Sequence, residues 1–260
     1  MNDSMYIAAT GMVAHQKSVD AIANNMANIS TQGYKKSRVN FEDLVYRGLA
    51  AAANPDAANG APALLSGSGV GIAALTKSFT QGELKKTDAM FDVAIQGDGF
   101  MEVTLADGSL QYTRGGALTV NQDGLLATAG GLPLRPAVRV GTDVRQLTVQ
   151  ADGIVMAQSD SQSSAIEVGR IELAHFADAS GLTPLGTNLY KATERSGDAI
   201  YGQPGEGPFG TLAQGYQESS NVNIVQEMVD LMVAQRAYES SVKVIQASDE
   251  MLAMGNNLRK

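Results

Sequence analysis

The sequence predicts an α+β protein in which N- and C-terminal helices form a coiled-coil-like unit and an extended intermediate region leads to a central all-β domain. Three observations predict this. Apolar residues recur at heptad spacing near both ends, the middle alternates with period two between Asp-Gly pairs, and stretches rich in Ala, Gly and Pro flank that middle. With 260 residues and no cysteine, the chain can build a core without disulfides.

The N-terminal segment predicts a helix from about Ser4 to Ile29, because its apolar residues form an a/d heptad seam. Asp3 or Ser4 can cap its start, and Gly33 can supply the left-handed residue after its end. His15 lies in the same seam, where we expect packing and not ligation. The seam residues predicted to mediate assembly are Met5, Met12, Val19, Ile22, Met26 and Ile29.

The C-terminal segment repeats the pattern, and Asn223 followed by Gln226 has the spacing of a capping box. Gln235 and Asp249 interrupt the apolar row, and the helix is expected to continue to about Leu258. The predicted assembly seam in this helix contains Ile224, Met228, Leu231, Tyr238, Val242, Ile245 and Leu252.

Each helix has one apolar stripe and therefore needs a neighbour, for which the other terminal helix is the simplest candidate. A two-helix seam leaves further residues without a place, namely Ala9, Gly11, Ala14, Ala21, Ala23, Val225, Val229, Met232 and Met251. We expect other copies of the chain to cover them. If each copy contacts the next by a non-closing operation, the product is a tube or filament.

The segment after the first helix is predicted to end that helix and turn the chain outward, because asparagine amides bond readily to free backbone groups. The residues expected to form this chain exit are Asn24, Asn25, Asn28, Gly33 and Tyr34.

The middle of the chain, from about residue 90 to 200, contains short strand-like runs separated by Asp-Gly pairs. Such pairs favour tight hairpins, in which both central residues have positive φ. The pairs begin at Asp98, Asp107, Asp123 and Asp152. We therefore expect an all-β domain here.

Several kinds of chemistry are disfavoured. The net charge of −8 argues against nucleic acid as a partner, and the basic cluster of Lys35, Lys36 and Arg38 is interpreted as a solvated face. We expect no membrane span, no metal and no cofactor, since apolar runs are short and the two histidines lie far apart. Ser240 and Lys243 have an S-x-x-K spacing, but the companion motifs of serine acyl-enzymes are missing.

Three long motifs resemble the flagellar rod and hook family. They are "IANNMANISTQGYKKSRVNFEDLVY" near the start, "FDVAIQGDGFMEV" with "YTRGGALTVNQDGLLATAGG" in the middle, and "GYQESSNVNIVQEMVDLMVAQRAYESSVKVIQASDEML" near the end. Within the family, the chain length, "FEDLVY" and the extended segment after Tyr46 most resemble the distal rod proteins. The similarity extends over nearly the whole chain.

The resemblance implies a non-enzymatic subunit of the bacterial flagellar basal body, polymerising helically into a rigid hollow shaft that transmits torque from motor to hook. It implies export through the flagellar apparatus without a cleaved signal peptide, into a rod that crosses the periplasm. The implied partners are further copies of the chain, other rod proteins, the hook protein, the L and P ring proteins and the export apparatus.

The resemblance also implies a division of the chain. Residues 1–30 and 222–260 would form the inner tube, 31–89 and 203–221 an intermediate region, and 90–202 an outer β domain. The segment 47–66 would wedge between neighbouring subunits.

The remaining alternatives are a proximal rod or hook-type protein of the same family, a secreted oligomeric adhesin or binding module, and a hydrolase using Ser240 and Lys243.

Overall fold

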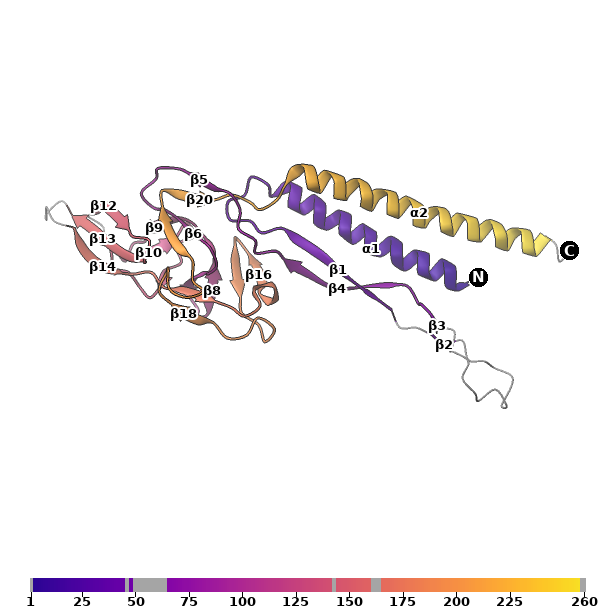
Figure 1. Ribbon diagram of the computed structural model, residues 1–260, viewed down its shortest axis with the longest axis horizontal. Helices are drawn as coiled ribbons and strands as arrows, with labels where there is room; N and C mark the ends of the chain where they lie inside the picture. Colours follow the sequence, from indigo (N-terminus) through magenta and orange to yellow (C-terminus); the bar gives the residue numbers. More distant parts are fainter. Residues whose placement is uncertain (1, 45–46, 49–64, 142–143, 160–164, 258–260) are drawn as a thin grey trace. The chain divides into compact units, whose positions relative to one another are not determined.

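The computed structural model describes residues 2–44, 47–48, 65–141, 144–159 and 165–257. The chain divides into two compact units. Unit 1 contains Met1–Ala27, Ser37–Thr76 and Asn223–Lys260, and unit 2 contains Asn28–Lys36 and Lys77–Val222. Helices at the two ends and a mostly β middle confirm the α+β class (Figure 1).

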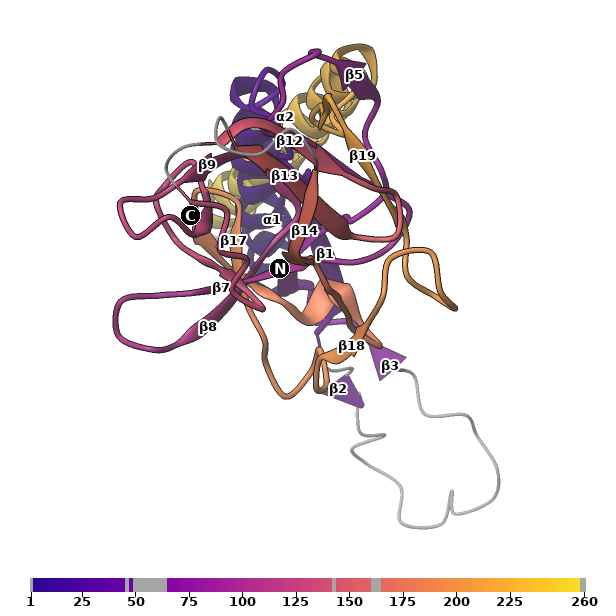
Figure 2. The ribbon, with the colours of Figure 1, turned by 90° about the vertical axis from the view of Figure 1, so that its left-hand side faces the viewer.

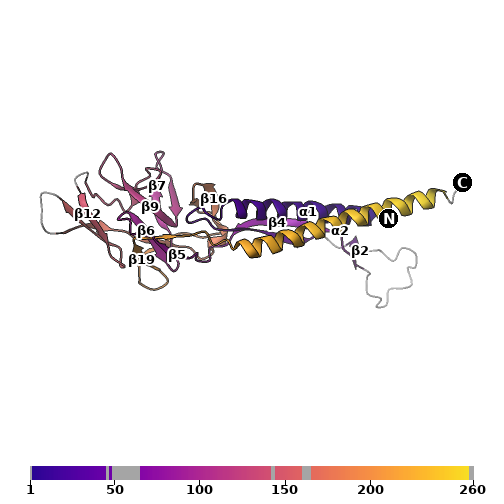
Figure 3. The ribbon, with the colours of Figure 1, turned by 90° about the horizontal axis from the view of Figure 1, so that it is seen from above.

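Unit 1 is built around two long helices, α1 (Asn2–Ala27) and α2 (Ile224–Asn257), which lie side by side (Figure 3). They are antiparallel. The Asn25 amide bonds to the Glu227 carboxylate, whereas Gly11, fourteen residues earlier in α1, faces Ser241, fourteen residues later in α2.

The helix ends agree only partly with the predicted capping signals. Helix α1 already contains Asp3 and Ser4, so neither residue caps its start as predicted. Helix α1 stops at Ala27, two residues before the predicted end, and a turn follows in which the Thr31 amide bonds to the Asn28 carbonyl at 3.1 Å. Asn223 caps α2, because its side chain accepts hydrogen bonds from the amides of Val225 and Gln226 at 3.0 and 3.3 Å. The Gln226 side chain bonds forward to Asp230.

The face of α2 that is buried differs by one residue from the predicted seam. The buried row contains Glu227, Ala234 and Ser248, with half-buried Ser241 at the same seven-residue spacing. The prediction instead placed Met228 and Val242 in this row. The physical reason lies at the contact between Gly11 and Ser241, since small residues let two helices approach more closely than Met or Val would.

A ribbon of strands completes the described part of unit 1. Strand β1 (Ser37–Asp43) is hydrogen-bonded to β4 (Val70–Lys77) and contacts α1. Strand β2 (Arg47–Gly48) pairs antiparallel with β3 (Leu65–Ser66). Residues 49–64 of the predicted 47–66 insertion lie outside the described residues.

Unit 2 consists of several small sheets, as expected for the β-rich middle. The sheet orders are β10-β9-β6-β19, β11-β7-β8-β17-β16, β12-β13-β14, β15-β18 and β20-β5. Figure 2 shows β12, β13 and β14 side by side. The strands are β5 (Leu84–Lys86), β6 (Asp92–Gln96), β7 (Met101–Thr104), β8 (Leu110–Thr113), β9 (Gly115–Val120), β10 (Leu126–Thr128), β11 (Leu134–Arg135), β12 (Val144–Val149), β13 (Ile154–Ser159), β14 (Ile166–Arg170), β15 (Leu173–His175), β16 (Thr183–Gly186), β17 (Leu189–Lys191), β18 (Ile200–Gly202), β19 (Thr211–Gln214) and β20 (Tyr216–Glu218). One short 3-10 helix, η1, spans Ala179–Gly181.

Two clusters of buried side chains form the core of unit 2. The larger is aliphatic and includes Val93, Ile95, Leu126 and Val155. The smaller is aromatic, with edge-to-face ring contacts that join Phe79, Phe100, Tyr112, Phe176 and Tyr190.

Three of the four Asp-Gly pairs connect paired strands, but not by the predicted two-residue turns. In the β7–β8 hairpin the Leu105 amide bonds to the Ser109 carbonyl, and the Gly108 amide bonds back to the Leu105 carbonyl. Of the Asp107-Gly108 pair, only the glycine is left-handed, as in three-residue hairpin loops. The prediction is wrong for Asp98-Gly99, which carries the chain from one sheet to another.

Candidate assembly site

Helix α2 presents an exposed apolar face. Seven of its exposed large apolar residues belong to the first four turns or so, and Val225 reaches 67 % exposure. At about 100° per residue, Val225, Val229 and Met232 lie on the opposite side of α2 from the buried row. The exposed apolar residues of α2 are Ile224, Val225, Met228, Val229, Met232, Val233, Tyr238, Val244, Met251, Leu252 and Met254.

The predicted seam residues divide between buried and exposed positions. In α1, Ile22 is buried, and Met5, Met12, Val19 and Met26 are half-buried. Ile29, just beyond the helix, is also half-buried. In α2 the half-buried members are Leu231, Val242 and Ile245, and the exposed members are Ile224, Met228, Tyr238 and Leu252.

Of the small residues left over from the predicted two-helix seam, Ala9 and Ala21 are half-buried, Ala23 is exposed, and the other two find places within the single chain. Gly11 faces Ser241, and Ala14 is buried. The large ones, Val225, Val229, Met232 and Met251, are all exposed. The described part of unit 1 therefore leaves them without a covering surface.

A second apolar feature of unit 1 is a groove of about 330 Å³ between α1 and β4. Its lining includes Ala9, Val13, Val70 and Ile72. Thr10 also lines the groove. Its hydroxyl donates a hydrogen bond to the Ile7 carbonyl and accepts one from the Val70 amide. The groove and the exposed face of α2 are thus two different apolar surfaces of the same unit.

Asn25 joins three segments at the end of the helix pair. Its side chain is buried, and its Oδ1 accepts a hydrogen bond from the Ser37 amide at 2.8 Å. Its Nδ2 donates to the Ser37 carbonyl at 2.9 Å and to Glu227 Oε2 at 3.0 Å. A single amide therefore holds the end of α1, the start of β1 and the first turn of α2.

The other residues of the predicted chain exit have separate local roles. Asn24 is exposed, and Asn28 Oδ1 accepts a hydrogen bond from the Thr31 hydroxyl. Gly33 is left-handed, with φ of 66°, as predicted, and its amide bonds to the Glu218 carbonyl. Tyr34 is buried, and the Lys77 ammonium lies 4.1 Å from its ring centroid.

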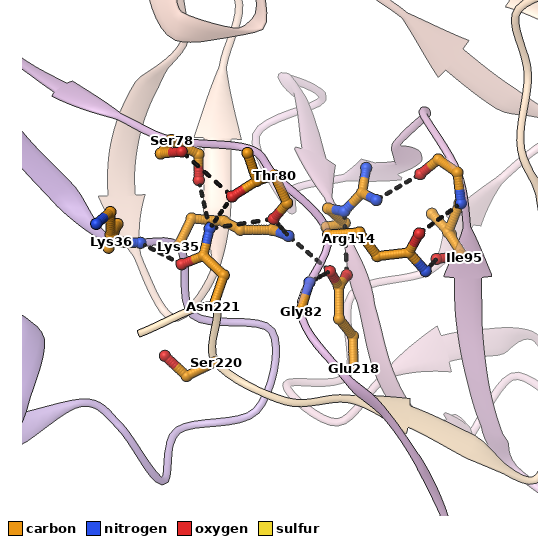
Figure 4. Close-up of polar contacts among 12 residues, drawn as sticks. Lys35, Lys36, Ser78, Thr80, Gly82, Ile95, Arg114, Glu218, Ser220 and Asn221 are labelled. Carbon is orange, nitrogen blue, oxygen red and sulfur yellow. Dashed lines mark hydrogen bonds and ion pairs between the residues drawn. The ribbon is translucent and has the colours of Figure 1, made fainter. Parts of the chain in front are cut away.

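A buried ion cluster in unit 2 corrects the expectation of a solvated basic face. Lys35 is fully buried, and its Nζ lies 2.6 Å from Glu218 Oε1 (Figure 4). Arg114 Nε lies 3.0 Å from Glu218 Oε2, and the Gly82 amide donates to Oε1 at 2.7 Å. The sequence could not reveal this, because Lys35 and Glu218 are 183 residues apart.

The cluster holds two cations around one carboxylate. Burial is the main cause that lowers the pKa of Lys35, and the Arg114 charge lowers it further, while Glu218 acts in the opposite direction. Lys35 also donates to the Thr80 carbonyl at 2.8 Å. Arg38, in contrast, is exposed as predicted.

Asn221, near the end of unit 2, bonds to the two segments beside it, one ending at Lys36 and the other beginning at Lys77. Its Oδ1 accepts from the Lys36 amide at 2.8 Å, and its Nδ2 donates to the Ser78 carbonyl at 2.8 Å (Figure 4). The segments that enter and leave unit 2 are therefore fixed by polar side chains.

The described residues contain no group of three or more His, Asp or Glu side chains arranged to hold a metal ion. His15 is half-buried with an edge contact to the Phe41 ring, and Ser240 and Lys243 are exposed on α2. No helix in the described part of the chain is both long and apolar enough to cross a membrane.

Three family models match the chain in order. Residues 5–35 match "Flagella basal body rod protein", 94–157 match "Flagellar hook protein FlgE/F/G D1 domain", and 213–258 match "Flagellar basal body rod FlgEFG protein C-terminal". The first and third ranges contain most of α1 and α2.

Similar proteins named "Flagellar basal-body rod protein FlgG" align over nearly their full lengths. The one from Borreliella burgdorferi is 42 % identical and aligns over 100 % of both chains. Those from Buchnera aphidicola subsp. Schizaphis graminum and Agrobacterium fabrum are each 41 % identical, over 97 % and 96 % of this chain and 98 % and 97 % of their own. The chain therefore belongs to the FlgG family of flagellar basal-body rod proteins.

Proposed function

We infer that the chain is a structural subunit of the distal rod of the bacterial flagellar basal body, and we propose that it works by helical self-assembly through its terminal helices. Similarity to FlgG proteins over the full chain supports the rod assignment. The relatives are named as rod proteins, which also supports a structural and not an enzymatic role.

The exposed apolar face of α2 is the observation that carries the assembly proposal. Its large side chains lie opposite the face that packs on α1, and the described residues leave them exposed, so another copy of the chain is proposed to cover them. Fully burying one such side chain contributes about 1.5–3 kcal/mol. Several residues per copy, repeated along a polymer, therefore provide many lateral contacts.

The groove between α1 and β4 supports a heterologous contact between copies. A surface that differs from the exposed face of α2 allows each copy to present one surface and receive the other, which generates a helical polymer when the operation does not close. In this proposal the helices of residues 1–30 and 222–260 pair in coiled-coil fashion within an inner tube. The outer β domain of residues 90–202 connects to that tube through the intermediate region of 31–89 and 203–221.

The proposal extends to partners that rod membership implies. Other rod proteins and the hook protein adjoin this polymer, the L and P ring proteins surround it, and the flagellar export apparatus delivers its subunits without signal cleavage to a rod crossing the periplasm. The segment 47–66, wedged between neighbours, stiffens the polymer that transmits torque.

Replacing Met232 by aspartate tests the proposal. Burying an unpaired carboxylate is costly, so we expect Met232→Asp to remain monomeric at concentrations where the parent chain forms tubes visible by electron microscopy. Leu185→Asp is the matched control, because Leu185 is 49 % exposed in β16 and Met232 is 52 % exposed in α2.

The control is expected to assemble normally, and both variants should retain the near-ultraviolet circular dichroism of the aromatic cluster. Normal tubes from Met232→Asp would contradict the assembly role of this face. A second variant, lacking residues 224–260, should also fail to form tubes.

A further inference from the structure

The methionines of this chain divide sharply by exposure. The chain has 11 methionines, and all four in α2 are exposed, by 46–58 %. Every other methionine that the structure describes is buried or half-buried. The exposed four are Met228, Met232, Met251 and Met254.

Their position on α2 is as distinctive as their exposure. At about 100° per residue, Met228, Met232 and Met254 lie within the outward half of the helix, which they share with Val225 and Val229. The small residues at Ala234 and Ser241 face the other way, toward α1. Three of the four thioethers are therefore part of the apolar face that the described residues leave uncovered, and Met251 is exposed at the edge of that face.

Among the side chains of an apolar face, the methionine thioether is the one that a mild oxidant can convert into a polar group. In the reaction with hydrogen peroxide, the sulfur lone pair attacks one peroxide oxygen and the O–O bond breaks. A proton transfer then yields the sulfoxide and water. Sulfur loses two electrons to the peroxide, and a sulfoxide reductase with a thiol donor reverses the change, releasing water.

We propose that the four methionines of α2 form an oxidation site for peroxide in the unassembled subunit, and that their sulfoxides block assembly reversibly. The claim that the sulfoxides block assembly rests on the proposed function. Once a copy has joined the polymer, its neighbours cover the face and exclude the oxidant. Oxidation therefore acts on subunits that have not yet assembled.

The remaining methionines provide controls within the same molecule. Met101 is 1 % exposed in the aliphatic core of unit 2. The Met90 sulfur accepts a hydrogen bond from the Leu147 amide, and the Met156 sulfur accepts one from Gln150. These sulfurs are expected to react more slowly than those of α2.

The first arm of the test treats the full-length monomer with hydrogen peroxide and follows each methionine by peptide mass spectrometry. We expect Met228, Met232, Met251 and Met254 to oxidise at least about tenfold faster than Met101. Equal rates in a folded monomer would overturn the assignment of the site.

The second arm measures the critical concentration for polymerisation. Because burying one methionine accounts for roughly a tenfold change or more in association, we expect oxidised protein to require at least about tenfold higher concentration. Treatment with methionine sulfoxide reductases A and B should restore the original value. A variant with all four residues replaced by leucine should polymerise before and after peroxide treatment.

The two arms separate this inference from the proposed function. If untreated protein polymerises and oxidation of the four sulfurs leaves its critical concentration unchanged, the inference is overturned and the proposed function stands. If the leucine variant loses assembly after peroxide as the parent chain does, other residues are responsible and the inference is overturned. If untreated protein never polymerises, the proposed function fails together with the assembly arm, while the oxidation rates still decide the site.

Discussion

Replacing Glu218 by glutamine should destabilise unit 2 strongly, because this carboxylate is the partner of two buried cations. Lys35 is fully buried and Arg114 is 2 % exposed, and both bond to Glu218. Removing one partner of a buried ion pair costs about 3–5 kcal/mol. Since domains are typically stable by about 5–15 kcal/mol, this loss is a large part of the total.

Lys35→Met should cost distinctly less than Glu218→Gln. It removes the cation whose charged form burial disfavours, and it leaves the Arg114–Glu218 pair intact. Because the two residues share one cluster, the double variant should be more stable than the sum of the two single losses predicts.

Urea unfolding of the full chain measures these differences. The chain has no tryptophan, so near-ultraviolet circular dichroism reports the aromatic cluster of unit 2, which includes Tyr112 and Tyr190. The control is Lys86→Met, which removes an exposed ion pair with Asp88 and should not shift the midpoint measurably. A loss of unfolding free energy below about 1 kcal/mol for Glu218→Gln would refute the reasoning. So would a loss for Lys35→Met that exceeds the loss for Glu218→Gln.

Three further predictions concern the protonation of Lys35 and the contacts of Asn25 and Asn223. Relative to Lys35→Met, the parent chain should gain stability as the pH rises toward the ordinary lysine pKa of about 10.4. The reason is that the folded pKa of Lys35 is lowered, so the unfolded chain binds the proton more tightly. Urea midpoints of the two proteins that diverge in the opposite direction would contradict this. Asn25→Ala removes the hydrogen bonds that the Asn25 amide makes to the Ser37 backbone and to Glu227, which should weaken the docking of α1 on α2 by about 2–4 kcal/mol. Faster amide exchange near Glu227 measures this loss, and unchanged exchange there would show that the amide is dispensable. Asn223→Ala removes the cap of α2 and should cost about 1 kcal/mol, with faster exchange confined to the first turn; an equal effect along the whole helix would exclude a local capping role.

Local sequence signals predicted the elements because those signals act over a few residues. The heptad rows predicted both helices, Asn223 marked the start of α2, and the left-handed Gly33 marked the turn after α1. Period-two alternation predicted the β-rich middle, and Asp107-Gly108 marked the β7–β8 loop, although with three loop residues in place of two.

Long-range contacts could not be predicted from those local signals. The packing face of α2 contains Ala234 and Ser248, which are too small or too polar to belong to a heptad row of large apolar residues. Lys35 looked like a surface residue because its partner Glu218 is distant in sequence, as is Arg114, which shares that carboxylate. In both cases the environment is created by the fold, so the residue type alone is misleading.

A single cysteine on the outward face of α2 tests the central claim most directly, since the chain has none of its own. Val229→Cys places a unique thiol at a position that is 44 % exposed, and Leu185→Cys places one in the β16 control position. Maleimide labelling rates are compared between dilute monomer and assembled polymer. We predict that the Val229→Cys thiol reacts readily in the monomer and is protected in the polymer, whereas the Leu185→Cys thiol is not. Equally fast labelling at Val229→Cys in both states would contradict the account.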